Sequence, residues 1–290
     1  MLQYYLYKLC SLVLPLLPAQ VGFSLASLAG YLLYYISPGK RRVVKANLRQ
    51  VLGVEASDRD IGRIAREVFQ NSAKNYFDVL RLPAFDVANF DRVLAIHGLA
   101  HFEEAVKEGR GVIIATIHLG NFDFVTQVLA GRSVKLTVLV EPINPPALLR
   151  MFISLRESKG LTFVPVASCS LKTVIKALRR GEVVALTYDR AIQESGLAVS
   201  FFGAETKIPV GAIAIAQKTG SAILPAFAVR DGLDRYNIFI EPPIRFYPPN
   251  GHTLEEEAEK LVGLMEKYIR QHPEQWVVFE PIWKSGLSKN

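Results

Sequence analysis

The chain has 290 residues, of which 50% are hydrophobic and 21% charged, and its mean hydropathy is +0.21. The length suits one large domain or two small ones with a sizeable core, and the apolar excess is high for a fully soluble protein. A formal charge of +7 indicates an anionic partner, whether nucleic acid, membrane surface or acidic substrate. Neither Cys10 nor Cys169 has a cysteine or histidine neighbour at metal-ligand spacing, which argues against a zinc site.

The apolar excess lies at the N-terminus. No charged residue occurs from residue 9 to 39, a run longer than the roughly 20 residues that span a bilayer. A secretory signal peptide fits less well, because only Lys8 precedes the run and no small-x-small cleavage site stands out. We expect residues 1–39 to be a retained membrane anchor, which Pro15 and Pro18 break into a hairpin or an oblique interfacial helix.

A basic segment follows the apolar stretch at once, with Lys40, Arg41, Arg42, Lys45 and Arg49. By the positive-inside tendency, these side chains place the body of the protein in the cytoplasm. We expect residues 40–290 to form the second, functional domain.

The remaining elements follow from the spacing of apolar residues. Ser57 and Asp58 cap a helix that runs to about residue 82 and ends before Pro83, and a second helix covers 99–108. Short β-branched runs predict buried strands at 111–117, 135–141, 161–166, 183–189, 222–230 and 236–243. Helical stretches are expected at 121–130, 145–159, 170–180, 209–219 and 254–271. The alternation predicts an α/β fold with a central, largely parallel or mixed sheet flanked by helices.

His118 differs from the other histidines. It follows the strand 111–117 and precedes a glycine-containing turn and a helix, which places it at the mouth of an α/β sheet. Asp123, in the first turn of that helix, can hydrogen-bond one imidazole nitrogen and leave the other as a base. The alternative is a strand-end histidine with an aspartate favoured by the helix dipole, and the spacing alone does not decide.

No serine or cysteine nucleophile accompanies this pair, and the chain has no Gly-x-Ser-x-Gly elbow. A base would then have to activate the hydroxyl of an acceptor directly, without a covalent enzyme intermediate.

The segment 118–123 reads HLGNFD and resembles the His-x4-Asp box of the glycerolipid and lipid A acyltransferase superfamily. Further blocks, in the same order, resemble its late lipid A (lauroyl/myristoyl) and phosphatidylinositol mannoside acyltransferases: RRVVKANLRQVLG (41–53), LRESKG (155–160), LRRGEVVALTYDR (178–190), SFFGAETKIPVGAIAIAQKTGSAILPAFAVR (200–230) and PEQW (273–276). The resemblance covers nearly the whole chain. Glu141, the Asp-Arg pair at 189–190 and VVFEPIW (277–283) look more like the mannoside branch than the lipid A branch.

The resemblance implies a membrane-associated O-acyltransferase on the cytoplasmic face of the bacterial inner membrane. It would move a fatty acyl chain from acyl-CoA or acyl carrier protein to a hydroxyl of a phosphatidylinositol mannoside-like glycolipid, with lipid A as the alternative acceptor. No metal or redox cofactor is expected. Two other classes remain open: a catalytically idle lipid-binding protein, and a nucleic-acid-binding protein, for which only the charge speaks.

The resemblance also implies roles for single residues. His118 is the general base and Asp123 orients it. Backbone N–H groups near Gly120 and Asn121 are expected to stabilise the oxyanion, and Asn121 is counted among the substrate-binding residues. Arg156 is expected to hold a substrate phosphate or the oxyanion, and Glu141 to shape the acceptor site or to pair with Arg156.

Two further groups are candidates for the substrate site. Asp189 and Arg190 should lie at the same sheet edge as His118, unless they only form a structural ion pair. The three residues Phe201, Phe202 and Gly203 are expected to form a tight turn that lines the acyl groove.

Overall fold

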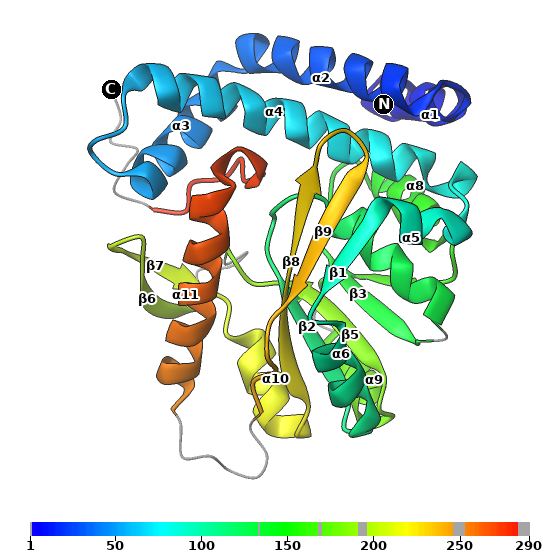
Figure 1. Cartoon of the computed structure of the whole chain (residues 1–290), viewed down its shortest axis with the longest axis vertical. Coiled ribbons are helices and arrows are strands. Elements are labelled where there is room, and N and C mark those ends of the chain that lie inside the picture. The colour runs from blue at the N-terminus through cyan, green and yellow to red at the C-terminus, as the bar shows by residue number, and fades with distance from the viewer. Residues whose placement is uncertain (1, 133, 168–169, 191–195, 246–252, 284–290) are drawn as a thin grey trace.

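The computed structural model describes residues 2–132, 134–167, 170–190, 196–245 and 253–283, so that Cys169 and His252 lie outside the described residues. Its centre is a seven-stranded sheet in the order β1-β9-β8-β2-β5-β3-β4 (Figure 1). All neighbouring strands are parallel except β8 and β9. The predicted α/β class is therefore confirmed. The strands are β1 Leu94–His97, β2 Val112–Thr116, β3 Leu136–Val140, β4 Thr162–Pro165, β5 Val183–Thr187, β8 Ala222–Asp231 and β9 Arg235–Ile240.

Helices cover both faces of the sheet, because the central strands are apolar on both sides and must be buried twice. One face packs against α5, α6, α7, the 3-10 segment η4 and α8, and the other against α9, α10 and α11. Their bounds are α5 Phe90–Val93, α6 Leu99–Lys107, α7 Phe122–Val125, η4 Thr126–Arg132, α8 Pro146–Glu157, α9 Ser170–Arg179, α10 Gly211–Thr219 and α11 Leu254–Gln271. Thr253 and Glu256 form a reciprocal capping box at the start of α11.

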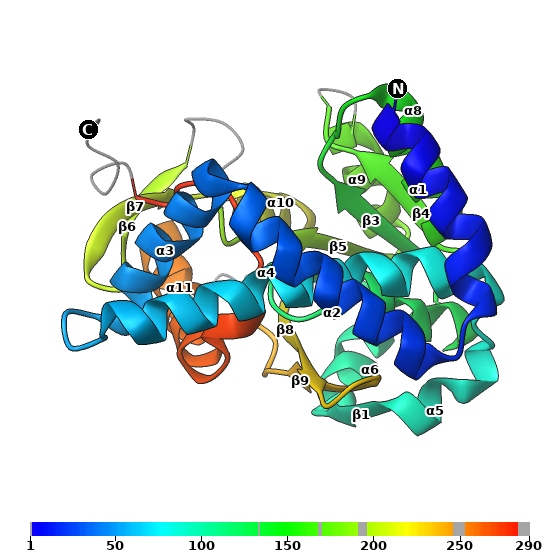
Figure 2. The same ribbon diagram turned by 90° about the horizontal axis from the view of Figure 1, so that it is seen from above.

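The N-terminal helices form a separate layer at one end of the sheet: α1 Leu2–Val13, η1 Leu14–Leu16, α2 Ala19–Ile36, α3 Pro38–Leu52 and α4 Asp58–Arg81. Of the described helices, α2 alone is long and apolar enough to cross a bilayer. It lies along α4 in both views (Figures 1 and 2). A Cβ at Gly30 would come within 2.5 Å of the backbone of α4, so the two helices touch along their backbones.

Several elements differ from the sequence-based expectation, including α3 and α5, for which no helix was expected. The helix expected at 121–130 is one short α-turn followed by η4. Strand β1 was not among the expected strands, because its four residues are too few to show an alternating apolar pattern. The hairpin of β6 Leu197–Phe201 and β7 Ala204–Ile208 was not predicted, because its half-exposed strands do not read as buried runs.

Candidate active site

The candidate site forms where three adjacent parallel strands end. In the sheet, β5 lies between β2 and β3, and Thr116 of β2 is level with Thr187 of β5. Each strand is followed at once by polar residues: His118 after β2, Asp189 with Arg190 after β5, and Glu141 after β3. The carboxyl ends of parallel strands meet at one edge, which is where α/β proteins place their ligands.

His118 is held by Asp189. Its Nδ1 lies 2.8 Å from Asp189 Oδ1, and its backbone N–H donates to Asp189 Oδ2 at 3.0 Å. The indole N–H of Trp276 donates to the same Oδ2 at 3.0 Å. Asp189 is 1% exposed, whereas the His118 side chain is 18% exposed and can meet a substrate.

The expectation that Asp123 orients His118 is therefore corrected, because Asp189 is the carboxylate bonded to the imidazole. The physical reason is the parallel pairing of β2 and β5. It brings Asp189 to the level of His118 from 71 residues away, whereas Asp123 bonds instead to Arg156 of α8.

Electrostatics favour an ionised Asp189 and stabilise the charged form of His118. Burial acts to raise the pKa of Asp189, but the charge of His118 and the hydrogen bonds from His118 and Trp276 outweigh it and hold this pKa below its ordinary value. Burial likewise acts to lower the pKa of His118, and the charge and hydrogen bond of Asp189 outweigh it and raise that pKa. Since an ionised carboxylate only accepts, the Nδ1–H of His118 donates to Asp189 and Nε2 of the neutral ring is free to accept a proton.

A second ion pair joins Asp123 to Arg156. Arg156 Nη2 lies 2.6 Å from Asp123 Oδ2, and Asp123 is 8% exposed. The other oxygen, Asp123 Oδ1, and the Nε of Arg156 are buried without a hydrogen-bond partner among the described residues. The hydrogen-bonding capacity of both atoms is therefore unused within the described part of the chain.

A third group surrounds Arg190. Its guanidinium contacts Glu141 and lies 3.1 Å from Glu280, so Glu141 pairs with Arg190 and not with Arg156. Asp189 does not pair with Arg190, because it bonds to His118. Glu141 Oε1 is buried without a partner in the described part of the chain.

Tyr76 of α4 lies electrostatically close to both ion pairs. It is 43% exposed, and its charged neighbours are Arg156, Asp123 and Glu280. Partial burial of the residue is the main cause that raises the pKa of Tyr76. Sequence reasoning missed both Tyr76 and Glu280, since an exposed helical tyrosine and a tail glutamate carry no signal of their own.

The backbone of the turn after His118 is hydrogen-bonded to the C-terminal segment 275–277. Gly120 N–H donates to the carbonyl of Gln275 at 3.0 Å, and Val277 N–H donates to the carbonyl of His118 at 2.8 Å. Gly120 has φ 57°, and a Cβ there would lie 2.2 Å from the carbonyl oxygen of Ala228, so only glycine fits. The expected oxyanion role of the Gly120 N–H is wrong, because that group is already used.

Asn121 also serves the protein rather than a substrate. It is 2% exposed, its Nδ2 donates to Asp78 at 2.9 Å and its Oδ1 accepts from Phe124 N–H at 3.2 Å. Its expected place among the substrate-binding residues is therefore corrected.

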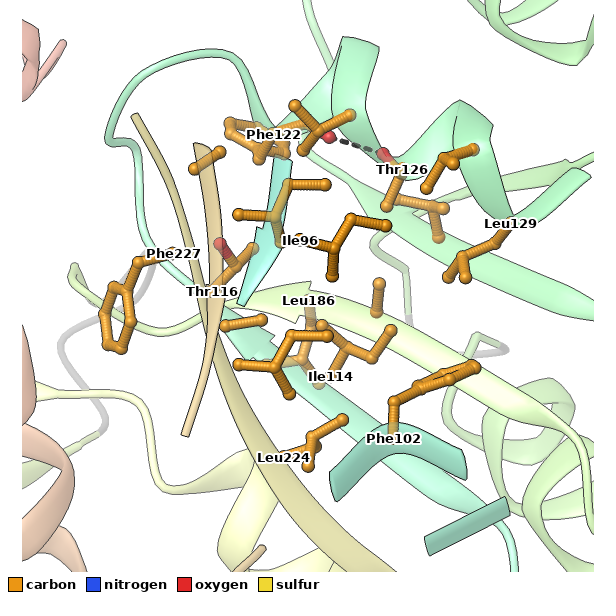
Figure 3. Close-up of a pocket in the computed structure, with 18 of the residues that line it drawn as sticks. Ile96, Phe102, Ile114, Thr116, Phe122, Thr126, Leu129, Leu186, Leu224 and Phe227 are labelled. Carbon is orange, nitrogen blue, oxygen red and sulfur yellow. Dashed lines mark hydrogen bonds between the residues drawn. The ribbon is translucent and has the colours of Figure 1, made fainter. Parts of the chain in front are cut away.

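An apolar pocket lies next to His118, which is not itself one of the residues that line it. Thr116, Phe122 and Thr187 line this pocket, and the Phe122 ring stands edge-on to the His118 imidazole at 5.6 Å. In Figure 3 the side chains of Ile114, Leu186, Leu224, Phe102 and Leu129 converge on the same space. Almost all of the side chains that line the pocket are apolar, and such a lining suits a hydrophobic ligand.

The residues expected to line an acyl groove, Phe201, Phe202 and Gly203, lie away from this pocket, and their role stays a prediction. Phe202 and Gly203 form the β6–β7 turn, as the sequence indicated, with φ of 50° and 75°. Phe201 is buried and stacks on Trp283 at 5.4 Å. None of the three lines the pocket. Within the described ranges, no group of three histidine, cysteine, aspartate or glutamate side chains is placed to hold a metal ion.

This fold and site belong to a known class. The chain is a member of the bacterial lipid A biosynthesis acyltransferase family, whose sequence profile it matches over residues 1–285. It is similar to the phosphatidylinositol mannoside acyltransferase of Mycobacterium tuberculosis (strain CDC 1551 / Oshkosh), with 29% identity over 273 residues, or 89% of this chain and 81% of that protein. The protein of the same name from Mycolicibacterium smegmatis is 26% identical over 258 residues, or 88% of this chain and 83% of that protein. The predicted family and branch are thus confirmed, and the chain is an acyltransferase of that family.

Proposed function

We propose that this acyltransferase moves a fatty acyl chain from an acyl thioester, carried by CoA or acyl carrier protein, to a hydroxyl of a phosphatidylinositol mannoside-like glycolipid. The observation that carries the proposal is the His118–Asp189 hydrogen bond next to an apolar pocket. A base beside a hydrophobic pocket is what the transfer of an acyl chain to a hydroxyl requires.

The reaction needs one proton to move twice. His118 Nε2 takes the proton of the acceptor hydroxyl while the hydroxyl oxygen attacks the thioester carbonyl. The tetrahedral oxyanion collapses and breaks the carbon–sulfur bond, and the leaving thiolate takes the proton from the imidazolium. Asp189 stabilises that imidazolium throughout, because its carboxylate stays bonded to Nδ1–H. Acid–base catalysis of this kind contributes about 10²–10⁴-fold, and oxyanion stabilisation and proximity supply the rest.

The charged mouth supports a polyhydroxylated acceptor. Asp123 Oδ1 and Glu141 Oε1 are buried acceptors that lack a partner among the described residues, and sugar hydroxyls are donors that satisfy such oxygens. We assign the Nε–H of Arg156 to the oxyanion or to a substrate phosphate, since it is a cationic donor without a hydrogen-bond partner among the described residues. The relatives of this chain carry the name phosphatidylinositol mannoside acyltransferase, which agrees with such an acceptor.

The N-terminal helices support a membrane location. Large apolar side chains stand exposed along α1, η1 and α2: Leu9, Leu12, Leu16, Leu25, Leu28, Leu32 and Ile36. The opposite face of α2 is packed on α4, so we propose that residues 1–39 lie in the interface and do not cross the bilayer. The basic start of α3 then faces the anionic cytoplasmic surface of the inner membrane, with residues 40–290 as the catalytic part.

An acceptor assay tests the proposal. Purified protein is incubated with radiolabelled palmitoyl-CoA, or the acyl carrier protein thioester, and either a phosphatidylinositol mannoside or a lipid A precursor. We expect label on the mannoside, and a loss of about 10²–10⁴-fold in His118→Ala. The matched control is His97→Ala, because His97 is exposed on β1 and stacks on Phe239 away from the mouth. Label on lipid A alone would replace the acceptor, and full activity of His118→Ala would overturn the base.

A further inference from the structure

A buried cluster of charged side chains lies behind the turn that carries His118, centred on Asp78 near the end of α4. Asp78 is 0% exposed. Its Oδ2 accepts from Asn121 Nδ2 at 2.9 Å, from Arg230 Nη2 at 2.6 Å and from the hydroxyl of Tyr236. Its Oδ1 accepts from Arg81 Nε at 3.0 Å. One carboxylate therefore collects donors from α4, β8, β9 and the turn.

The contact with Asp78 fixes the direction of the Asn121 amide. The Oδ1 of Asn121 accepts the N–H of Phe124 and so caps α7, while Nδ2 faces the carboxylate. Asn121 carries an acceptor on one side and donors on the other, and only one orientation satisfies both partners. The side chain therefore links the first turn of α7 to α4.

A second link from α4 reaches the preceding residue of the turn. Asn75 Nδ2 donates to the carbonyl of Gly120, and Asn75 Oδ1 accepts from Arg230 Nη2 at 3.1 Å. Asn75 and Asp78 are three residues apart and lie on one face of the helix. Two successive residues of the turn are thus bonded to one face of α4.

The cluster is sealed from water by aromatic rings. The Phe23 ring of α2 lies 4.9 Å from the Arg81 guanidinium and 5.0 Å from that of Arg230. Two cations therefore share one carboxylate in a dry site. Buried ion pairs add little net stability, so net stability alone does not explain this cluster. In this protein the cluster also reaches the turn, through the hydrogen bond from Asn121 to Asp78.

We propose that Asp78 is a positioning residue, which acts through Asn121 to hold the turn where His118 meets Asp189. This inference rests on the proposed function, in which His118 is the base. Asp78 is fully buried and touches no substrate. Its effect reaches the reaction because Asn121 and His118 belong to one tight turn, in which a shift at one end alters the His118–Asp189 contact at the other.

Asn121→Ser is the sharpest variant. Serine keeps a capping oxygen for the N–H of Phe124 but is too short to reach Asp78, so the start of α7 survives while the link is cut. Asp78→Asn removes the charge at constant volume and serves as the second variant. The matched control is Ser221→Ala, which deletes a fully buried hydroxyl and its 2.9 Å hydrogen bond to Arg110 at the opposite end of β8.

We expect kcat of Asn121→Ser to fall on the order of 10- to 100-fold, with the KM of both substrates changed by no more than about twofold, because the base is displaced and the binding groups are not. The acid limb of the pH–rate profile should also move to lower pH, since a weaker contact with Asp189 stabilises the imidazolium less. A purely structural role would lower the folded fraction and leave the limb in place, as expected for Ser221→Ala.

Nitrogen-15 NMR of the histidine side chains makes the test independent of catalysis. The His118 signal is identified by its loss in His118→Ala, and its tautomer and titration are followed in the wild type and in both link variants. Loss of the Nδ1–H tautomer in the variants supports the inference even if the wild type transfers no acyl chain, in which case only the proposed function fails. Unchanged His118 titration and unchanged kcat in folded Asn121→Ser and Asp78→Asn would overturn the role of Asp78.

Discussion

The turn from His118 to Asn121 differs from the rest of the site in whether its polar groups have hydrogen-bond partners within the protein. In the turn, His118, Gly120 and Asn121 all bond to protein partners. Beside it, two carboxylate oxygens of the mouth lack partners in the described residues, the pocket is empty of side chains, and the outer face of α2 is apolar and exposed. Unpaired buried polar atoms and exposed apolar patches are costly in a protein at rest. The contrast agrees with the proposed function, in which the base is fixed before the substrate arrives and the other surfaces are completed by the substrate and the membrane.

Asp189→Asn disrupts the hydrogen bond that holds His118, and among the variants we expect it to have the largest effect. An amide in place of the carboxylate disturbs the tautomer of His118 and no longer stabilises its cation, so we expect kcat to fall on the order of 10²–10⁴-fold. The pKa of His118 is raised by Asp189, and the base works only when neutral. Removing the charge lowers that pKa, so the acid limb of kcat/KM moves to lower pH.

The pH–rate profile and the thermal midpoint of Asp189→Asn are measured together. Asp189 also bonds to Trp276, and a lower midpoint accounts only for lost folded protein, not for a moved limb. An acid limb that stays at the wild-type pH would show that Asp189 does not set the protonation of His118.

Glu141→Gln tests the part of the site in which carboxylate oxygens lack a partner among the described residues. An acceptor that donates to Glu141 Oε1 loses a charge-assisted hydrogen bond, so we expect its KM to rise about 10-fold or more while the KM of the acyl thioester stays constant. Glu182→Gln is the matched control, because Glu182 also pairs with an arginine, Arg180, but at the opposite end of β5. Equal effects of the two variants would remove Glu141 from the acceptor site.

The difference between the two sides also explains what sequence could predict. Periodicity predicted the sheet and most helices, and the strand-end position of His118 needed only local pattern. The partner of His118 depends on which strands are neighbours. Asp123 was preferred because it is near in sequence, while Asp189 comes from the adjacent parallel strand. The role of Asp78 could not be predicted for the same reason, because the sequence does not show that this helical aspartate is 0% exposed.

The pocket is the second open surface, and filling it should change selectivity more than rate. Ala185 of β5 and Leu224 of β8 flank Ile114 of β2, two residues below the level of Thr116. We expect Ala185→Leu to shift the preferred acyl chain to shorter lengths and Leu224→Ala to longer ones. Each methylene gained or excluded is worth about 0.8 kcal/mol, or roughly fourfold in kcat/KM. Competition between acyl-CoAs of different length measures the shift, and opposite variants that move it in the same direction would argue against a chain in this pocket.

The exposed apolar face of α2 lies outside the active site, so removing its leucines should change kcat less than the other variants do. Leu28 and Leu32 are one helical turn apart and 54% and 53% exposed. In Leu28→Asp/Leu32→Asp, we expect sedimentation with anionic vesicles to fall at least 10-fold, because each leucine forfeits about 1.5–3 kcal/mol of burial. With acceptor dispersed in detergent, kcat should stay within about twofold. Leu171→Asp, on α9 at the far end of the sheet, is the control and should sediment like wild type (Figure 1). If kcat in detergent fell as much as vesicle binding, α2 would be part of the structure that supports the His118 turn and not only a membrane-binding surface. Phe23 of α2, which contacts Arg81 of the Asp78 cluster, would be the connection.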